Sequence, residues 1–407
     1  MRKKNGITLA AATVLMLSSG AGWADQAAPA APPKPAIPSI TDILMSSGIT
    51  ASGYVDATFS AFGYSGSQLV NGVEVSHPGG YDTFNFQQAG LTLAYQPSAG
   101  FGALINPVVT SYNSIYAENY APDSNYYLHT AGSGPGAPAF AIYQGYAQYV
   151  TGAWSVIAGK FATLAGAEVY APPGNANVTR SLLFTFEPLT HTGVRATYAP
   201  SSKFSFIIGA NNGWFDSGDE SSFGAPKTLE VGIALNPTKT LAWTLQDYFG
   251  SDYIPLYGTH ADIELFDTVL TWTITSQLIL VGSVDYGDVA SLGAIPSANW
   301  WGVAGYVNYQ FNPKWRLSLR GEYLDDADGF LTDAAAVGGV GSPLPAPGEE
   351  ALKEVTLTFG WDPVSHLELR IEGRYDDPDS VMPKPAGRSV DVYPKTEQGW
   401  LEALWKF

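Results

Sequence analysis

Apolar and polar residues alternate along much of this chain with a period of two. The clearest run is His366–Asp376, where each apolar or small residue is followed by a charged one. A β-strand points successive side chains to opposite faces, so this run predicts a strand with one apolar and one charged face. The apolar face belongs either in the core of a soluble sheet or against lipid, and in the second case the charged face lines a wet lumen.

The same alternation recurs in 301–311, 315–323 and 354–361, with aromatic residues at the ends of these runs. Aromatic girdles at both interfaces are typical of membrane barrels. A soluble sheet would need covering layers for so many apolar faces, and the sequence offers almost no helix to provide them.

Short and long connections alternate along the chain. The short ones carry Pro or other turn formers, as in Phe311–Trp315 and Trp361–His366, and predict tight hairpins. The long ones are 64–82, 111–139, 162–180, 212–226, 251–261, 288–299, 326–352 and 377–395. Between them lie about sixteen segments of roughly ten residues, the length of a tilted membrane strand. The sequence therefore predicts an all-β fold, a closed antiparallel transmembrane β-barrel over residues 50–407, with short periplasmic turns and long extracellular loops.

The N-terminus has the form of a signal peptide. Arg2, Lys3 and Lys4 precede a short apolar stretch, and Ala24 ends a small-residue cleavage motif, so we expect residues 1–24 to be removed on export. A membrane anchor is the alternative, but the stretch is shorter than the roughly 18 residues that a spanning helix needs. Residues 25–49 predict a periplasmic Ala/Pro-rich spacer with a short helix at 39–45. The predicted location is the cell outer membrane.

Composition narrows the function classes. Only 14% of the residues are charged while 45% are hydrophobic, a mixture that fits a lipid face and a lumen face averaged together, although a large secreted β-sandwich could show it too. The chain has no cysteine, which excludes disulfides and thiolate metal sites. Loss of the signal peptide takes the basic count from 20 to 17 against 37 acidic residues, and a net charge of −20 excludes nucleic acid as a partner.

Several short segments, in their order along the chain, resemble the β-barrel porin family described as OmpL-like. They are Gly53–Asp56, Gly159–Glu168, Asn175–Phe184, His191–Arg195, Asn212–Trp214, Arg320–Tyr323, Asp328–Gly329 and Arg370–Tyr375. The resemblance covers roughly Thr50–Phe407. It implies an outer-membrane pore without catalytic residues, and it does not name the solute.

A barrel of this size is too wide for side chains to fill, so a pore needs a constriction. The resemblance to porins suggests that the connection after the fifth strand, 162–180, folds inward and places Glu168 opposite an arginine wall. A solvated surface loop is the alternative, and 111–139 and 326–352 are rival constrictions.

Charged residues of one parity form the predicted pore wall. They are Arg195, Arg316, Arg320, Glu322, Glu368, Arg370, Glu372 and Arg374. These residues either set a transverse field that selects solutes or form ion pairs that only brace the barrel. Lys160 cannot be assigned to either face.

The chain ends in an aromatic strand closing on Phe407, which resembles the signal read by the barrel-assembly machinery. Acidic clusters in the long connections could bind divalent cations that bridge to lipopolysaccharide, but solvated loops are the simpler interpretation. No catalytic or cofactor motif is complete, because Gly159–Phe161 lacks the rest of a P-loop and the histidines are scattered.

We therefore expect a porin, not an enzyme, passing small hydrophilic solutes or ions without a metal or cofactor. The alternative is a barrel that acts as an adhesin or a lipid-modifying enzyme. The sequence leaves the formation of a homo-oligomer open.

Overall fold

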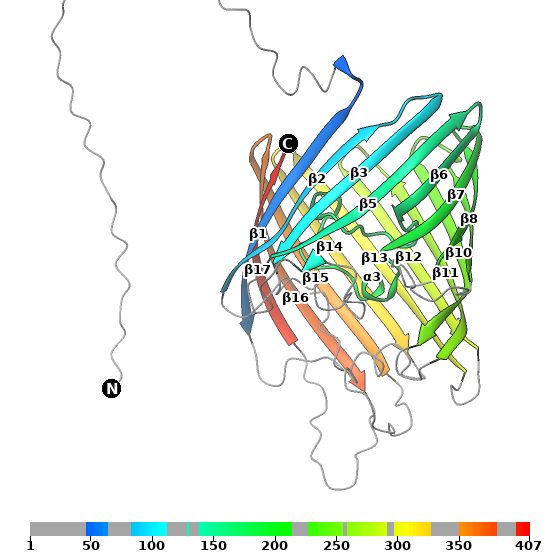
Figure 1. Ribbon diagram of the computed structural model, residues 1–407. Helices are drawn as coiled ribbons and strands as arrows, with labels where there is room; N and C mark the ends of the chain where they lie inside the picture. The colour runs from blue at the N-terminus through cyan, green and yellow to red at the C-terminus, as the bar shows by residue number, and fades with distance from the viewer. Residues whose placement is uncertain are drawn as a thin grey trace, which may run out of the picture. The chain divides into compact units, whose positions relative to one another are not determined.

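Sixteen long antiparallel strands form a closed barrel (Figure 1). The computed structural model describes residues 46–63, 83–111, 128–129, 138–213, 227–254, 259–290, 297–326, 350–380 and 396–407. The strands are β1 Thr50–Gly63, β2 Thr83–Tyr95, β3 Gly100–Ser111, β5 Pro138–Thr151, β6 Trp154–Ala162, β7 Thr190–Ser201, β8 Phe204–Asn211, β9 Thr228–Leu235, β10 Leu241–Ile254, β11 Thr259–Thr273, β12 Leu278–Val289, β13 Ala298–Asn312, β14 Trp315–Asp326, β15 Glu350–Val364, β16 Leu367–Ser380 and β17 Thr396–Lys406. A two-residue strand, β4 (Leu128–His129), pairs with β5.

The ring closes between the first and last strands. β1 pairs with β2 on one side and with β17 on the other, and β3 pairs directly with β5. At the seam, the Gly53 and Phe407 backbones exchange two hydrogen bonds of 2.9 Å. Closure gives each of the sixteen long described strands a partner on both sides, which is the condition for strands in lipid.

The short connections lie together at one end of the barrel (Figure 1). Only residues 202–203 join β7 to β8, and only 313–314 join β13 to β14. This sorting confirms the predicted hairpins and strand number. Several strands are longer than predicted: β10 and β11 extend into the expected connection 251–261 and leave only 255–258 between them.

The barrel is inverted relative to a soluble sheet. On β16, Glu372 and Arg374 are 2% and 3% exposed, whereas Ile371 is 55% exposed. The neighbouring strands repeat this arrangement, with Leu357 and Leu401 outside and Thr356 and Glu402 inside. The apolar face of His366–Asp376 therefore points outward, as expected for a membrane barrel.

Exposed aromatic side chains cluster near both ends. At the short-turn end, Trp315 stacks on Trp361 with ring centroids 5.2 Å apart, and Trp154 lies 4.7 Å from Tyr198. At the opposite end, Trp301 lies 5.3 Å from Tyr323. Rings at these levels match the two interfaces of a bilayer.

Between the described strands, helical structure is confined to short pieces. A 3₁₀ turn, η1 (Pro172–Gly174), and a helix, α3 (Leu182–Phe186), lie between β6 and β7. Within the described ranges, no helix is both long and apolar enough to cross a membrane. The predicted signal peptide and the helix expected at 39–45 lie outside the described residues.

Candidate functional site

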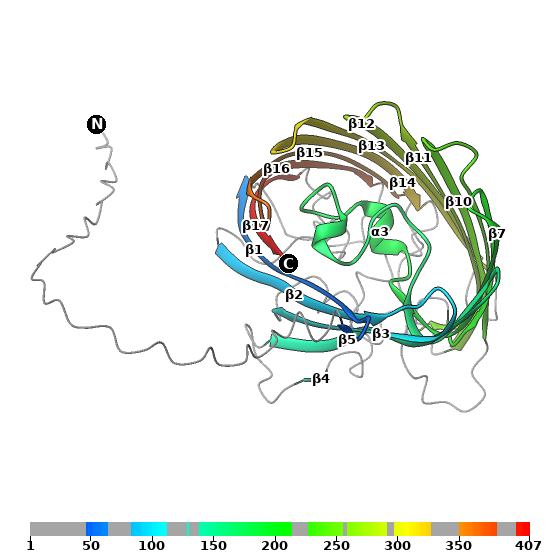
Figure 2. The same ribbon diagram turned by 90° about the horizontal axis from the view of Figure 1, so that it is seen from above.

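The connection between β6 and β7, residues 163–189, lies inside the barrel. Viewed along the barrel, α3 stands within the ring of strands (Figure 2). We call residues 163–189 the inner segment. The predicted constriction ended at 180, but β7 begins only at Thr190, so nine further residues belong to this connection. Ser181 caps α3 by accepting a hydrogen bond of 2.9 Å from Phe184 N.

Two polar side chains give the inner segment its own fold. The Arg180 guanidinium donates to the carbonyls of Val169, Tyr170 and Val178 at 3.0–3.1 Å. Asn175 accepts from Val169 N at 2.8 Å and donates to Val169 O at 2.7 Å. Both side chains are buried. Their hydrogen bonds supply partners for backbone groups of the inner segment, which has little regular secondary structure of its own.

Two wall carboxylates accept hydrogen bonds from the inner segment's backbone. Glu372 accepts from Val178 N at 2.6 Å and from Thr179 N at 2.8 Å, and Thr179 Oγ1 adds a bond of 2.6 Å. Glu322 accepts from Leu182 N at 2.7 Å. Hydrogen bonds to a charged acceptor are the stronger kind, so these contacts attach the segment firmly to β14 and β16.

Wall arginines donate to the same stretch of backbone. Arg316 donates to Ala176 O at 2.6 Å, Arg320 to Thr179 O at 2.8 Å, and Arg374 to Arg180 O at 2.6 Å. Arginine donors and glutamate acceptors on β14 and β16 thus bind the backbone of residues 176–182.

The structure corrects the expected position of Glu168. We expected this residue to face the arginines across an open gap, but Glu168 Oε1 lies 2.8 Å from Arg320 Nη1. The other oxygen, Oε2, accepts from Ser181 N at 2.6 Å. The inner segment therefore lies directly on the arginine wall. The physical reason is that guanidinium groups with unfilled donors and a backbone with unfilled acceptors satisfy one another.

The predicted wall residues all lie on the inner face. Glu372 accepts hydrogen bonds, and each of the others forms an ion pair. Seven of the eight are buried, and the side chain of Arg316 is 15% exposed. Their ion pairs are Arg195–Glu230, Arg316–Glu368, Arg320 with Glu168, Glu322 and Glu354, Arg370 with Glu368 and Glu402, and Arg374–Asp376. Each arginine charge is thus offset locally.

The apolar side of the inner segment packs against a neighbouring part of the inner face of the barrel. Leu182, Leu183 and Phe186 join a buried cluster that includes Trp300 and Leu324. Burial of apolar side chains on this scale, about 1.5–3 kcal/mol for each fully buried one, adds to the polar anchors.

Lys160 lies on the outer parity of β6, because its Cα partners, Gly145 and Thr192, alternate with inward residues. The alternation there is weak, which explains why the sequence did not place it.

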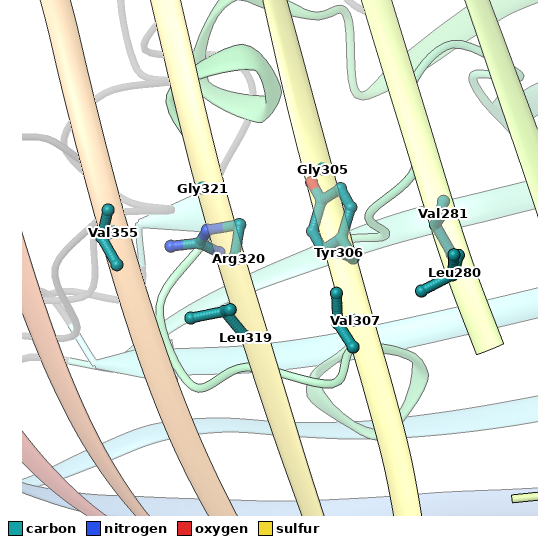
Figure 3. Close-up of a pocket in the computed structure, with 9 residues that line it drawn as sticks. All are labelled: Leu280, Val281, Gly305, Tyr306, Val307, Leu319, Arg320, Gly321 and Val355. Atoms are coloured by element: carbon teal, nitrogen blue, oxygen red, sulfur yellow. The ribbon is translucent and has the colours of Figure 1, made fainter. Parts of the chain in front are cut away.

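A hollow of about 450 Å³ on the barrel wall is not a solute site. Figure 3 shows its lining, which includes the outward residues Leu280, Val307, Leu319 and Val355 beside Gly305 and Gly321. Because glycine has no side chain, the two glycines leave a shallow depression in the lipid-facing surface.

Sequence reasoning missed Arg180, Thr179 and Asn177, because the inner segment has no periodicity that reveals which side chains point where. It also left out Glu354, although the alternation of 354–361 placed that residue on the polar face. The remaining inward acids, including Glu230, sit in strands whose polar face carries few charges.

The fold is similar to that of solved outer-membrane channels. The outer membrane channel DcaP of Acinetobacter baumannii has a TM-score of 0.57 at 14% identity, covering 88% of this chain and 97% of that chain. A loop-deletion mutant of OmpT, an outer membrane protein of Vibrio cholerae, has a TM-score of 0.55 at 12% identity, covering 88% and 99%. An anion-selective porin from Comamonas acidovorans has a TM-score of 0.54 at 9% identity, with the same coverage of each chain. No curated protein matches this chain.

The family comparison gives the identity. A family model described as "Putative beta-barrel porin-2, OmpL-like" matches residues 48–396. Together with the closed barrel, its inverted faces and its inner segment, this match shows that the chain belongs to the OmpL-like β-barrel porin family and is an outer-membrane channel protein.

Proposed function

We propose that the inner segment is the constriction of a passive channel for small hydrophilic solutes or ions. The observation that carries this proposal is the attachment of residues 176–182 to the inner faces of β14 and β16. A segment fixed in this way narrows a lumen that sixteen strands make wide enough to hold water. It also stays in one position, which a size limit requires.

The ion-paired wall supports bracing as the first role of Arg316, Arg320, Arg370 and Arg374. Each guanidinium is matched by at least one carboxylate within 3.1 Å. A field that selects solutes would then come from the net charge of the whole network rather than from a bare row of arginines.

Single-channel conductance in a planar bilayer tests the proposal. Protein shown to be folded by its β-sheet circular dichroism should give discrete conductance steps. A variant in which residues 166–186, the anchored stretch included, are replaced by a short Gly/Ser linker should give larger steps and admit larger neutral polymers, since Thr163 N and Leu189 O lie only 3.0 Å apart and a short linker can span the gap. Absence of steps from folded wild-type protein would refute the channel, and unchanged steps in the linker variant would refute the constriction.

We propose that residues 1–24 are a cleavable signal peptide and that the final strand is read by the barrel-assembly machinery. Phe407 supports this, because its ring is 59% exposed while its backbone closes the seam with Gly53. Deleting Phe407 should lower outer-membrane assembly in cells more than refolding in detergent. Equal losses would contradict a recognition role.

We propose that outer-membrane lipid and lipopolysaccharide surround the apolar outer face. A homo-oligomer that buries part of this face is compatible with the fold.

We also propose that the protein is not an enzyme. Of the histidines whose side chains the structure describes, His191 is fully buried against Tyr248, and His366 contacts the Lys406 carbonyl. Neither is placed as a general base beside a serine on the lipid face.

A further inference from the structure

Three buried carboxyl groups meet where the inner segment ends. Glu187, the C-cap residue of α3, extends to Asp267 on β11 and Asp285 on β12. One oxygen from each lies within 4.8 Å of those from the other two, and all three residues are buried. Asp267 and Asp285 are Cα partners on adjacent strands, so the sheet itself sets their spacing.

These acids differ from five other inward carboxylates. Glu168, Glu230, Glu322, Glu354 and Glu402 each form an ion pair with an arginine. Among the described side chains, no arginine or lysine pairs with Glu187, Asp267 or Asp285.

Asp267 gives a second, separate indication of a ligand. Its side chain is fully buried, and neither of its carboxylate oxygens accepts from a side-chain donor in the described part of the chain. Oδ1 of Asp285 is likewise buried and accepts no hydrogen bond from a described side-chain donor. Buried carboxylates that have neither a side-chain donor nor a cationic partner are costly unless a cation or a proton satisfies them.

The backbone at Gly166 leaves space for the Glu187 carboxylate. Gly166 has φ of +86°, and a Cβ at this position would collide with the Glu187 carboxylate.

We propose that Glu187, Asp267 and Asp285 bind a hard divalent cation, with Ca²⁺ the best fit. Carboxylate oxygens are the ligands of Ca²⁺ and Mg²⁺. Ca²⁺ holds oxygens at about 2.3–2.6 Å, so two of its ligands can stand up to roughly 5 Å apart, whereas Mg²⁺ at about 2.1 Å draws them closer. Separations within 4.8 Å allow all three oxygens to contact one ion, and Ca²⁺ tolerates an irregular ligand set better than Mg²⁺, which requires a near-ideal octahedron.

The site would fasten the second end of the inner segment. The first attachment lies on β14 and β16, and the cation would tie Glu187 to β11 and β12. This inference does not depend on permeation, because its test measures binding.

The test is calorimetric titration of chelator-treated, folded protein in detergent with CaCl₂ and with MgCl₂ at pH 8. Wild-type protein should bind about one Ca²⁺ per chain, and the double variant Asp267→Asn/Asp285→Asn should bind at least about tenfold more weakly. Asp288→Asn is the matched control, because Asp288 lies on the same strand with the opposite parity. It should titrate like the wild type.

Terbium luminescence supplies a second readout that needs no enthalpy signal. Tb³⁺ replaces Ca²⁺, and Trp300, which packs over Gly287 two residues from Asp285, can sensitise its emission. Added Ca²⁺ should quench this emission in the wild type, and the double variant should lack it. Failure of folded wild-type protein to bind Ca²⁺, or unchanged binding in the double variant, would show that the acids share protons instead and would overturn the proposal. Conductance without Ca²⁺ binding would leave the channel intact and reject only the cation site.

Discussion

Replacing Glu372 with Gln should loosen the inner segment. Glu372 is 2% exposed and accepts from Val178 N, Thr179 N, Thr179 Oγ1 and Thr358 Oγ1, two bonds on each oxygen. In Gln, one oxygen becomes an NH₂ group, which cannot accept. The two hydroxyls can rotate, but one backbone N–H is left facing another donor.

The magnitude follows from these contacts. A buried N–H without a partner costs about 1–3 kcal/mol, and the remaining bonds weaken because their acceptor is no longer charged. We expect a total of about 3 kcal/mol, which is roughly a 100-fold shift toward the detached segment. The barrel strands should stay folded, because the cross-strand hydrogen bonds of β16 are untouched.

Single-channel recording is the assay. The Glu372→Gln channel should show more frequent current fluctuations and a larger open conductance than the wild type. Glu397→Gln is the matched control, because Glu397 is exposed on the neighbouring strand β17. Conductance and noise equal to the wild type in the Glu372 variant would refute the reasoning that this carboxylate holds the constriction.

Three further changes test other parts of the structure. Replacing both Arg320 and Arg374 with Ala removes two buried cations and leaves carboxylates such as Glu354 uncompensated. The reversal potential in a salt gradient should therefore shift toward cation selectivity. An unchanged reversal potential would mean that these charges do not act on the ion path. Replacing Leu357, which is 48% exposed on the outer face, with Arg should destabilise the barrel in lipid vesicles by about 2–4 kcal/mol, measured by urea unfolding. A smaller effect than that of Arg at Thr197, which shares the inward parity of Arg195 and is only partly buried, would contradict the assigned orientation. Replacing Ser181 with Ala removes the cap of α3 and should cost about 1 kcal/mol of segment attachment, seen as faster proteolysis within the inner segment, while Ser202→Ala in a short turn should change nothing.

The barrel was largely predictable from residue order. A strand has a strict period of two, so Glu372 and Ile371 had to face opposite sides whatever the rest of the chain did. The alternation of short and long connections gave the strand number and the direction of each strand. Strand ends were less predictable, because residues such as those at 251–254 and 259–261 continue the ladder only by virtue of their neighbours' backbones.

The candidate site was predictable only in part. The inward parity of Arg320 and Glu372 came from the sequence, but their partners lie 140–194 residues away in the inner segment. The segment has no repeat, and its fold depends on three carbonyls meeting Arg180 and on backbone groups meeting wall side chains. The short helix α3 could not be expected from five residues, since a helix of that length is marginal without packing.

The sequence by itself determined the barrel-forming character of this chain, with charged residues of fixed parity facing a lumen, and it predicted export. Those properties depend on local period, turn chemistry and composition, which need no tertiary contact. The tertiary structure alone decided that the arginine wall lies beneath the inner segment and that Glu168 touches Arg320 instead of facing it. It also decided that three acids from distant positions meet without an arginine. The physical reason is that parity fixes the direction of a side chain, whereas its partner depends on how the barrel closes and where an aperiodic segment finds donors and acceptors.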